Sequence, residues 1–319
     1  MQDLTDENIT PNVIINNSNA PPRLKFTLSS LVTHLHDFAR ETRLTTEEWM
    51  AGIEFLTAAG EMCSDTRQEF ILLSDILGLS TLVESINHPK PPGATEGTVL
   101  GPFHTHDAKE KELGESIASP GKGEVCLVRG TVRDMQGNAI VGAKIDIWET
   151  DDTGHYDTQY DGRAGPDCRG IITSDKSGKF WFKAVKPVPY PIPLDGPTGV
   201  LLRVCNRHGY RPSHMHFLIT APGYDTLVTA LYTRGDPYEA SDAVFGVKSS
   251  LVVDFTRIED EKVLKAYGLQ IGAWGLEYDF VLLSDKEAKE YKEKKVAEAL
   301  EKAKSRARIL DGLPVADLD

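Results

Sequence analysis

Between residues 23 and 95, apolar side chains recur every three or four positions, the spacing that places them on one face of a helix. The first run covers residues 28–39. A second run follows Thr45 and Glu48, which have the spacing of a capping box at the start of a helix. Two shorter runs come before the proline-rich stretch 89–93, where prolines interrupt helices. This pattern predicts a helical domain over residues 23–95.

From about Glu124 the pattern changes to short runs rich in β-branched residues, separated by turns that contain Gly, Asn or Pro. The expected strands cover residues 125–132, 145–148, 180–185, 200–204, 216–220, 227–232 and 276–283. Many short strands of this kind are typical of a sandwich or a barrel, and not of a parallel α/β sheet. We therefore predict a mainly β protein, with an antiparallel β-sandwich domain over residues 96–283.

The two ends of the chain differ from this central part. Residues 1–22 are rich in Asn, Asp and Pro, and we expect them to form a flexible arm. Ser284 and Glu287 again have capping-box spacing, and the segment after them is highly charged with few apolar residues. We expect residues 284–319 to form a charged C-terminal helix and tail.

Composition and charge narrow the range of partners. The net charge of −13 and the pI near 5.2 argue against a nucleic-acid partner, because phosphate backbones attract basic surfaces. No run of about 18 apolar residues is present, so we expect no membrane span. The four cysteines are scattered without a C-x-x-C pair, and the acidic N-terminus does not resemble a signal peptide. These features predict a cytoplasmic protein.

Paired histidines are the first candidates for chemistry. His-x-His occurs three times, as His34/His36, His104/His106 and His214/His216. On a helix, residues two apart point to different faces, whereas in a strand they project from the same face. Only the third pair stands at the start of an expected strand, so both of its imidazoles could reach one cation. Paired histidines also occur as ordinary polar surface residues, so the motif alone does not decide between a metal site and a polar surface.

Two tyrosines stand in unusual local sequences. Tyr190 lies in the segment Lys186–Pro193, where four prolines hold the backbone extended. Tyr156 follows Trp148 through a polar turn that contains Gly154. A tyrosine in so stiff a frame is either a packed anchor or a positioned ligand, and its own sequence leaves both interpretations open.

Four motifs, taken in order, resemble the intradiol ring-cleavage dioxygenase family. They are Gly101-Pro-Phe103, the stretch from Trp148 to Tyr156, the proline-framed Tyr190, and the segment from Asn206 to Phe217. The resemblance covers about residues 25–283, and the helical block matches the N-terminal linker domain of the family. Two further segments, 72–78 and 242–248, are similar to the members of the family that cleave hydroxyquinol.

The resemblance implies a ferric ion, Fe(III), bound by Tyr156, Tyr190, His214 and His216. Phenolates are hard oxygen donors that suit Fe(III), and imidazoles bind iron equally well. A free phenol titrates near about 10, so its binding as a phenolate at neutral pH depends on the charge of the metal. The resemblance further implies that Tyr190 leaves the metal when substrate binds and accepts a substrate proton. Arg211 would stabilise negative charge on the substrate.

The implied reaction is the cleavage of hydroxyquinol (benzene-1,2,4-triol) by O2 between adjacent hydroxylated carbons, which gives maleylacetate (3-hydroxy-cis,cis-muconate). The resemblance also implies a homodimer formed through the helical domain, with a phospholipid in the dimer interface. Catechol or another substituted catechol is an alternative substrate. A non-catalytic β-sandwich module that binds a ligand or partner is an alternative of a different class.

The substrate pocket is expected from the same resemblance. Asp75 would accept a hydrogen bond from the third ring hydroxyl, which would discriminate against a ring without that group. The expected pocket positions are Leu72, Asp75, Val99, Leu100, Gly101, Pro191, Ile192, Ala230 and Val244. Ala230 departs from the family pattern, because many relatives carry glutamine or histidine there. Its side chain cannot make the hydrogen bond that those residues offer to the substrate.

Overall fold

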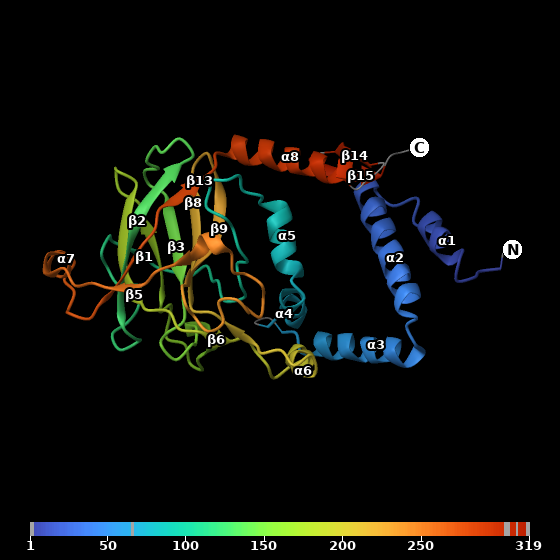
Figure 1. Cartoon of the computed structure of the whole chain (residues 1–319), viewed down its shortest axis with the longest axis horizontal. Coiled ribbons are helices and arrows are strands. Elements are labelled where there is room, and N and C mark those ends of the chain that lie inside the picture. Colours follow the sequence, from blue (N-terminus) through green and yellow to red (C-terminus); the bar gives the residue numbers. More distant parts are fainter. Residues whose placement is uncertain (1–2, 65–66, 303–306, 311, 317–319) are drawn as a thin grey trace. The chain divides into compact units, whose positions relative to one another are not determined.

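The computed structural model describes residues 3–64, 67–302, 307–310 and 312–316 (Figure 1). The chain divides into two compact units, Met1–Ala58 together with Glu290–Asp319, and Ala59–Lys289. All the residues expected above to bind metal or substrate lie in the second unit. No helix within the described ranges is long and apolar enough to span a membrane.

The helices expected from residues 23–95 are present. They are α2 (Pro22–Thr42), α3 (Thr46–Glu61), α4 (Glu69–Ile76) and α5 (Leu79–Asn87). The predicted capping box forms at α3, where Glu48 N–H donates to Thr45 Oγ1 at 3.2 Å and Thr45 N–H donates to Glu48 Oε2 at 3.0 Å. Gly78 separates α4 from α5 with a φ of 73°, a left-handed conformation that glycine adopts without strain.

The segment expected to be a flexible arm contains a helix. This helix, α1 (Ile9–Asn16), packs against α2. Arg40 Nη2 donates to Thr10 Oγ1 at 2.7 Å, and His36 Nδ1 lies 2.9 Å from the same oxygen. The prediction of a loose arm is therefore wrong for this stretch. Contacts with α2 stabilise a helix that is too short to form alone.

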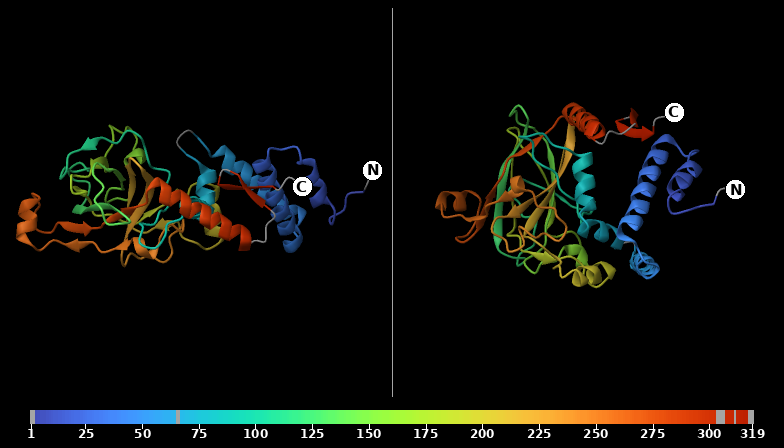
Figure 2. Two further views of the ribbon diagram at one scale, coloured as in Figure 1. Left: turned by 90° about the horizontal axis from the view of Figure 1, so that it is seen from above. Right: turned by 45° about the vertical axis from the view of Figure 1, so that its right-hand side comes forward.

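Two β-sheets occupy the centre of the second unit (Figures 1 and 2). The strands of the first sheet are β1 (Glu110–Lys111), β3 (Lys144–Trp148), β4 (Arg169–Thr173), β8 (His214–Ala221), β9 (Tyr224–Thr233) and β10 (Val252–Val253). Those of the second are β2 (Val125–Asp134), β5 (Lys179–Val185), β11 (Thr256–Arg257), β12 (Trp274–Glu277) and β13 (Phe280–Leu282). Side chains from both sheets share one buried core, which includes Ile147, Phe182, Phe217 and Phe280.

The sheets are mixed, and not purely antiparallel as expected. The first sheet has the order β1–β4–β3–β8–β9–β10, and its two edge strands pair in parallel. In the second, β2 pairs antiparallel with β5 but in parallel with β12 and β13. The packing of two sheets on a common core agrees with the predicted sandwich. The antiparallel part of the prediction holds only for the central strands β4–β3–β8–β9. Hydrophobic periodicity identifies the buried face of a strand and not the direction of its neighbour, so the parallel pairs could not be predicted from it.

One expected strand is a helix. Residues 200–204 belong to α6 (Pro197–Val204), so the prediction of a strand there is wrong. Pro197, at the first helical position, is a helix start signal. The Val and Leu residues that follow it are also typical of a short buried strand, which led to the wrong prediction. The expected strand 276–283 is also divided, with Tyr278 and Asp279 between β12 and β13.

Short elements complete the second unit. They are β6 (Tyr190–Pro191), β7 (Tyr210–Arg211), α7 (Glu261–Ala266) and the 3₁₀ turns Asp157–Gln159 and Ser249–Leu251. Within this unit, α4, α5 and α6 lie on one side of the sheets, and α7 lies on the opposite side (Figures 1 and 2).

The C-terminal helix is present as α8 (Asp285–Lys302). Its predicted capping box forms, because Glu287 N–H donates to Ser284 Oγ at 3.3 Å and Ser284 N–H donates to Glu287 Oε2 at 2.9 Å. The tail after it contains a hairpin that was not predicted, β14 (Ala307–Leu310) and β15 (Leu313–Ala316). Strand β15 packs on α2, where Arg23 Nη1 donates to the Pro314 carbonyl at 2.5 Å.

Candidate active site

Strand pairing in the first sheet brings several expected site residues into one row. Trp148 of β3 lies opposite Arg169 of β4 on one side and opposite His216 of β8 on the other. His216 in turn lies opposite Ala230 of β9. Residues directly opposite one another in neighbouring strands project from the same face of the sheet. His214, two positions before His216, shares that face, as the strand spacing predicts.

Tyr156 and Tyr190 complete a cluster with these two histidines. Tyr156 Oη lies 3.1 Å from Tyr190 Oη, and Tyr190 Oη lies 3.5 Å from His214 Nε2. His214 Nε2 lies 3.1 Å from His216 Nε2. All four side chains are buried, with at most 3% of their surface exposed. Two phenol oxygens and two imidazole nitrogens therefore face one another in the interior of the second unit.

The two tyrosines reach the cluster from irregular segments. Tyr156 follows β3 through a loop that turns at Gly154, whose φ is 79°. A Cβ at Gly154 would stand 3.0 Å from the Cβ of Tyr190, so the glycine allows the two segments to approach closely. Tyr190 lies in β6 opposite Arg211 of β7, and this pairing brings the proline-framed segment next to the segment that leads into β8.

The imidazoles of His214 and His216 are neutral. Burial, followed by the charge of Arg211, lowers the pKa of His214 well below its ordinary value. Burial and then the neighbouring charges do the same for the pKa of His216. The Nδ1–H of His214 donates to the Pro212 carbonyl at 2.6 Å, which leaves the Nε2 lone pair facing the cluster.

The phenol of Tyr156 also depends on its surroundings. Burial, together with Tyr190, raises the pKa of Tyr156 well above that of a free phenol. The phenol therefore keeps its proton unless a cation binds its oxygen. Neutral imidazoles and buried phenols are a donor set that suits a hard, highly charged metal ion. Among the described residues, no group of three or more His, Cys, Asp or Glu side chains could hold a metal in their place.

A buried arginine, Arg211, borders the cluster. Its Nη1 lies 3.1 Å from His214 Nε2, and its Nη2 donates to Tyr232 Oη at 3.1 Å. Its Nε and Nη2 donate to the two carboxylate oxygens of Asp242 at 3.2 and 3.4 Å. Burial alone would lower the pKa of Arg211, but Asp242, Tyr232 and Tyr190 together outweigh burial and the pKa is raised. A fixed cation thus lies beside the phenols and imidazoles.

Aromatic rings pack around the four side chains. Trp148 stacks on His216 with 4.9 Å between ring centroids and an angle of 2° between planes. Phe103 stacks on Tyr156 at 4.4 Å. Gly101 lies against His216, because a Cβ there would stand 3.6 Å from His216 Nε2. The motif Gly101-Pro-Phe103 therefore contacts two of the four expected ligands.

Several of the expected pocket positions lie together beside α4. The shared apolar cluster contains Leu72, Val99, Ile192 and Val244, with Ile76, Leu202 and Ala243. Asp75 in α4 is also buried, and burial raises its pKa. The charges of Arg211 and Asp242 both act on the Asp75 carboxyl, which places Asp75 within electrostatic reach of the arginine. Leu100 and Pro191 are exposed and lie outside this cluster.

The other two His-x-His pairs lie in different settings. His36 contacts Thr10 in the first unit. His104 Nε2 lies 3.0 Å from Asp146 Oδ2, and its ring meets that of His106 edge-on at 5.2 Å. The four cysteines Cys63, Cys126, Cys168 and Cys205 are free thiols.

Two residues that contact Arg211, namely Tyr232 and Asp242, were not predicted as site residues from the sequence. Tyr232 lies opposite His214 across β8 and β9 and contacts Arg211, which only the strand register reveals. Asp242 lies in a segment that already resembled the hydroxyquinol-cleaving relatives. Its carboxylate also accepts the backbone N–H of Gly246 at 2.9 Å, so it is fixed on both sides.

Two protein-family models match this chain, one over the helical domain and one over the β-sandwich. Residues 99–284 match the model of the family described as Dioxygenase, and residues 21–95 match that described as Catechol dioxygenase N terminus. The chain is 61% identical to the intradiol ring-cleavage dioxygenase hqdA of Aspergillus niger, over 100% of this chain and 97% of that protein. It is 49% identical to a hydroxyquinol 1,2-dioxygenase of a Rhizobium species, over 82% of this chain and 89% of that one.

A solved structure is similar over most of the same length. The hydroxyquinol 1,2-dioxygenase of Pseudomonas putida DLL-E4 superposes with a TM-score of 0.82 and 44% identity, covering 88% of this chain and 99% of that chain. These matches favour an enzyme over the non-catalytic module considered above. The chain belongs to the intradiol ring-cleavage dioxygenase family.

Proposed function

We propose that this protein is an Fe(III)-dependent dioxygenase that cleaves hydroxyquinol with O2 to give maleylacetate. The observation that carries the proposal is the convergence of Tyr156 Oη, Tyr190 Oη, His214 Nε2 and His216 Nε2, with successive distances of 3.1, 3.5 and 3.1 Å. Proteins at 49% and 44% identity are named hydroxyquinol 1,2-dioxygenases, which supports the choice of substrate.

The residues present fit a ferric ion. Both imidazoles are neutral, as metal binding requires, and the His214 lone pair faces the phenols. Tyr156 resists ionisation in the buried site, so a strongly charged cation is needed to make it a phenolate. When bound, ferric iron lowers the pKa of phenol and substrate hydroxyls and withdraws electron density from the ring, which makes the ring reactive toward O2.

The chain's own residues then handle protons and charge. Tyr190 is the proposed base, because its oxygen lies between Tyr156 and His214. As a phenolate that substrate had replaced on the metal, Tyr190 would accept a substrate proton and become a neutral phenol. Arg211 is the proposed stabiliser of negative charge on the ring. Its guanidinium is buried, is paired with Asp242, and reaches to within 3.1 Å of His214 Nε2.

We further propose that Asp75 recognises the third hydroxyl of the substrate. Its carboxyl is buried beside the apolar cluster of Leu72, Val99, Ile192 and Val244, which would form the wall along the ring. A buried acceptor left without its donor costs free energy, so a ring without that hydroxyl binds less well. Gly101, against His216, is proposed as part of the pocket wall, and Leu100 and Pro191 as its outer rim.

Ala230 supports catechol as a second candidate substrate. It lies opposite His216 and is fully buried, and its methyl group offers no hydrogen bond to a third hydroxyl or to the ring. The discriminating experiment is product identification under O2, with benzene-1,2,4-triol and catechol compared by kcat/KM. Maleylacetate and a preference for the triol support the proposal, and a preference for catechol overturns the choice of substrate.

We also propose that the helical domain forms a homodimer. Four apolar side chains of α2 are about half exposed in the single chain, namely Leu24, Leu31, Leu35 and Phe38. Further exposed apolar residues on α3 are Trp49, Met50, Ile53 and Leu56. Exposed apolar surface of this extent is typical of an interface. Sedimentation of the wild type and of Leu35→Glu tests the dimer, and mass spectrometry of solvent extracts tests the phospholipid that the resemblance implies.

A further inference from the structure

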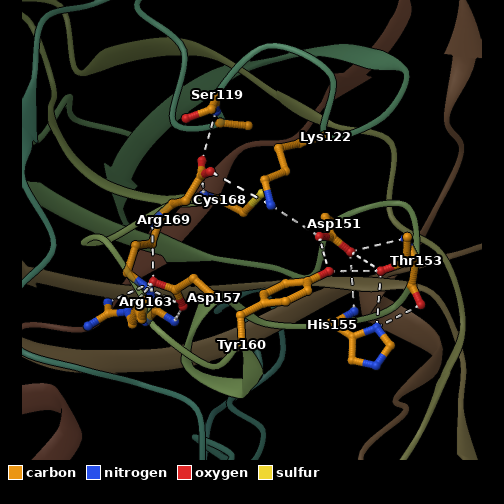
Figure 3. A network of polar contacts seen from close by, with 12 residues as sticks. Ser119, Lys122, Asp151, Thr153, His155, Asp157, Tyr160, Arg163, Cys168 and Arg169 are labelled. Atoms are coloured by element: carbon orange, nitrogen blue, oxygen red, sulfur yellow. Dashed lines mark hydrogen bonds and ion pairs between the residues drawn. The ribbon is translucent and has the colours of Figure 1, made fainter.

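A buried carboxylate, Asp157, directly follows Tyr156 and binds two arginines (Figure 3). Arg169 donates from Nε to Asp157 Oδ1 and Oδ2, at 3.0 Å each, and from Nη2 to Oδ1. Arg163 donates from Nε and Nη2 to Asp157 Oδ2 at 2.9 and 2.7 Å. The side chains of Arg169 and Asp157 are almost completely buried, so this pair is shielded from solvent and salt.

Both arginines also bind a second segment, residues 103–107. Arg169 Nη1 donates to the Phe103 carbonyl at 3.0 Å and to Thr105 Oγ1 at 2.9 Å. Arg163 Nη1 donates to Asp107 Oδ2 at 2.7 Å. The planar guanidinium fork allows each arginine to hold two segments at once, which a lysine ammonium cannot do in the same geometry.

The segment held in this way packs on the candidate active site. The Phe103 ring stacks on Tyr156 at 4.4 Å, and the His104 ring meets Trp148 edge-on at 4.7 Å. Trp148 in turn stacks on His216. Arg169 therefore acts on Tyr156 by two routes, through Asp157 in the chain and through the ring that covers the phenol.

The loop before Tyr156 is held by Asp151 (Figure 3). Asp151 Oδ1 accepts the hydroxyl and the backbone N–H of Thr153, at 2.6 and 3.0 Å, and Oδ2 accepts the Tyr160 hydroxyl at 2.6 Å. Lys122 joins this loop to the arginines, because its Nζ lies 3.4 Å from Asp151 Oδ2 and 4.0 Å from Asp167 Oδ2, and the Asp167 N–H donates to Asp157 Oδ2 at 3.2 Å. In the described part of the chain, the two arginines and not Asp151 bind residues 103–107. A change at Arg169 therefore acts most directly on the segment that covers Tyr156.

We propose that Arg169 and Asp157, extended by Arg163 and Asp107, are positioning residues that hold the Tyr156 phenol and the Phe103 ring in place in the active site. The inference rests on the proposed function, because it assigns Tyr156 as an iron ligand. Residues that do not bind a metal themselves but orient its ligands are important for metal binding. Their removal typically lowers metal affinity or activity by about 10- to 100-fold.

The test compares iron-loaded wild type with Arg169→Lys, Arg163→Gln and a control, Lys90→Gln. The control breaks another ion pair of the same unit, Lys90 Nζ to Asp225 Oδ2 at 2.5 Å, in which the lysine side chain is 6% exposed. The measurements are the tyrosinate-to-iron absorption band, the rate of iron loss to a chelator, kcat and KM, and the melting temperature.

In Arg169→Lys we expect a shifted absorption band, iron loss about 10-fold faster, and a fall in kcat larger than the change in KM. Arg163→Gln, at a partly exposed position, should show the same changes to a smaller degree and keeps the test open if Arg169→Lys does not fold. Lys90→Gln should lower only the melting temperature.

The inference is overturned if both arginine variants keep the wild-type band and rate of iron loss, or if Lys90→Gln changes them equally. A wild type that binds no iron and shows no band overturns the proposed function itself. A wild-type band with unchanged variants contradicts the positioning role alone.

Discussion

Asp242 provides the sharpest energetic prediction, because it is the carboxylate that compensates a buried guanidinium. The side chains of Arg211 and Asp242 are 3% and 2% exposed. In Asp242→Ala the arginine loses both of its contacts to carboxylate oxygens, and the backbone N–H of Gly246 loses its acceptor. Breaking a buried ion pair by removing one partner costs about 3–5 kcal/mol, so the free energy of unfolding should fall by that amount.

The activity should fall for a separate reason. Asp242 fixes the plane of the guanidinium that reaches toward His214 and Tyr232. Without it, Arg211 can rotate away from the position in which it would stabilise charge on the ring. Removal of one preorganised donor of this kind lowers kcat by about 100- to 1000-fold in enzymes that stabilise an oxyanion, and we expect an effect toward the lower end.

A double variant separates stability from catalysis. Asp242→Ala combined with Arg211→Met removes the uncompensated charge, so its free energy of unfolding should lie above that of Asp242→Ala, while its activity should be as low or lower. Urea unfolding and kcat/KM for benzene-1,2,4-triol are measured on the wild type, both single variants and the double variant. Full activity in Asp242→Ala, or a double variant less stable than Asp242→Ala, would refute the reasoning.

Three further predictions follow from the same site. Asp75→Ala should lower the preference for benzene-1,2,4-triol over catechol by about 10- to 100-fold, the effect of one hydrogen bond to a charged group, and an unchanged ratio of kcat/KM values contradicts the pocket assignment. Tyr156→Phe should keep the stacked ring but lose most of the tyrosinate-to-iron absorption and of the activity; an intact spectrum would exclude this residue as a ligand. In iron-free protein, the pKa values of His214 and His216 are lowered, so below about pH 6.5 these residues bind protons in the unfolded chain but not in the folded chain. The free energy of unfolding should therefore fall as the pH decreases, by up to about 2.7 kcal/mol per pH unit. This slope should be smaller in His216→Gln.

Local sequence signals predicted helices α2–α5 and α8 and the strands β2, β3, β5, β8 and β9, because each depends on a short pattern of buried positions. Strand β4, which lies inside the first sheet, was not predicted. The capping boxes at Thr45 and Ser284 formed as predicted, since they involve residues only three positions apart. Helix α1 was missed because packing on α2 stabilises it. The strand predicted at residues 200–204 is helix α6, where Pro197 at the first position is the better signal.

The four expected metal ligands could be predicted from the sequence, whereas the residues that contact and position them could not. Strand periodicity was sufficient to place His214 and His216 on one face, and the structure brings Tyr156 and Tyr190 to them. The position of Tyr232 beside Arg211 depends on the register of β8 and β9, and that of Arg169 beside Phe103 depends on a contact 66 residues apart. Such contacts leave no periodic trace in the chain, so sequence patterns could not reveal them.

The most direct test of the central claim is the visible absorption spectrum of the protein reconstituted with ferric iron, recorded before and after benzene-1,2,4-triol is added without O2. The account predicts bound iron, a wine-red tyrosinate-to-iron band, and a changed band when the substrate replaces Tyr190. A colourless protein that binds no iron and gains no activity on reconstitution would contradict the account.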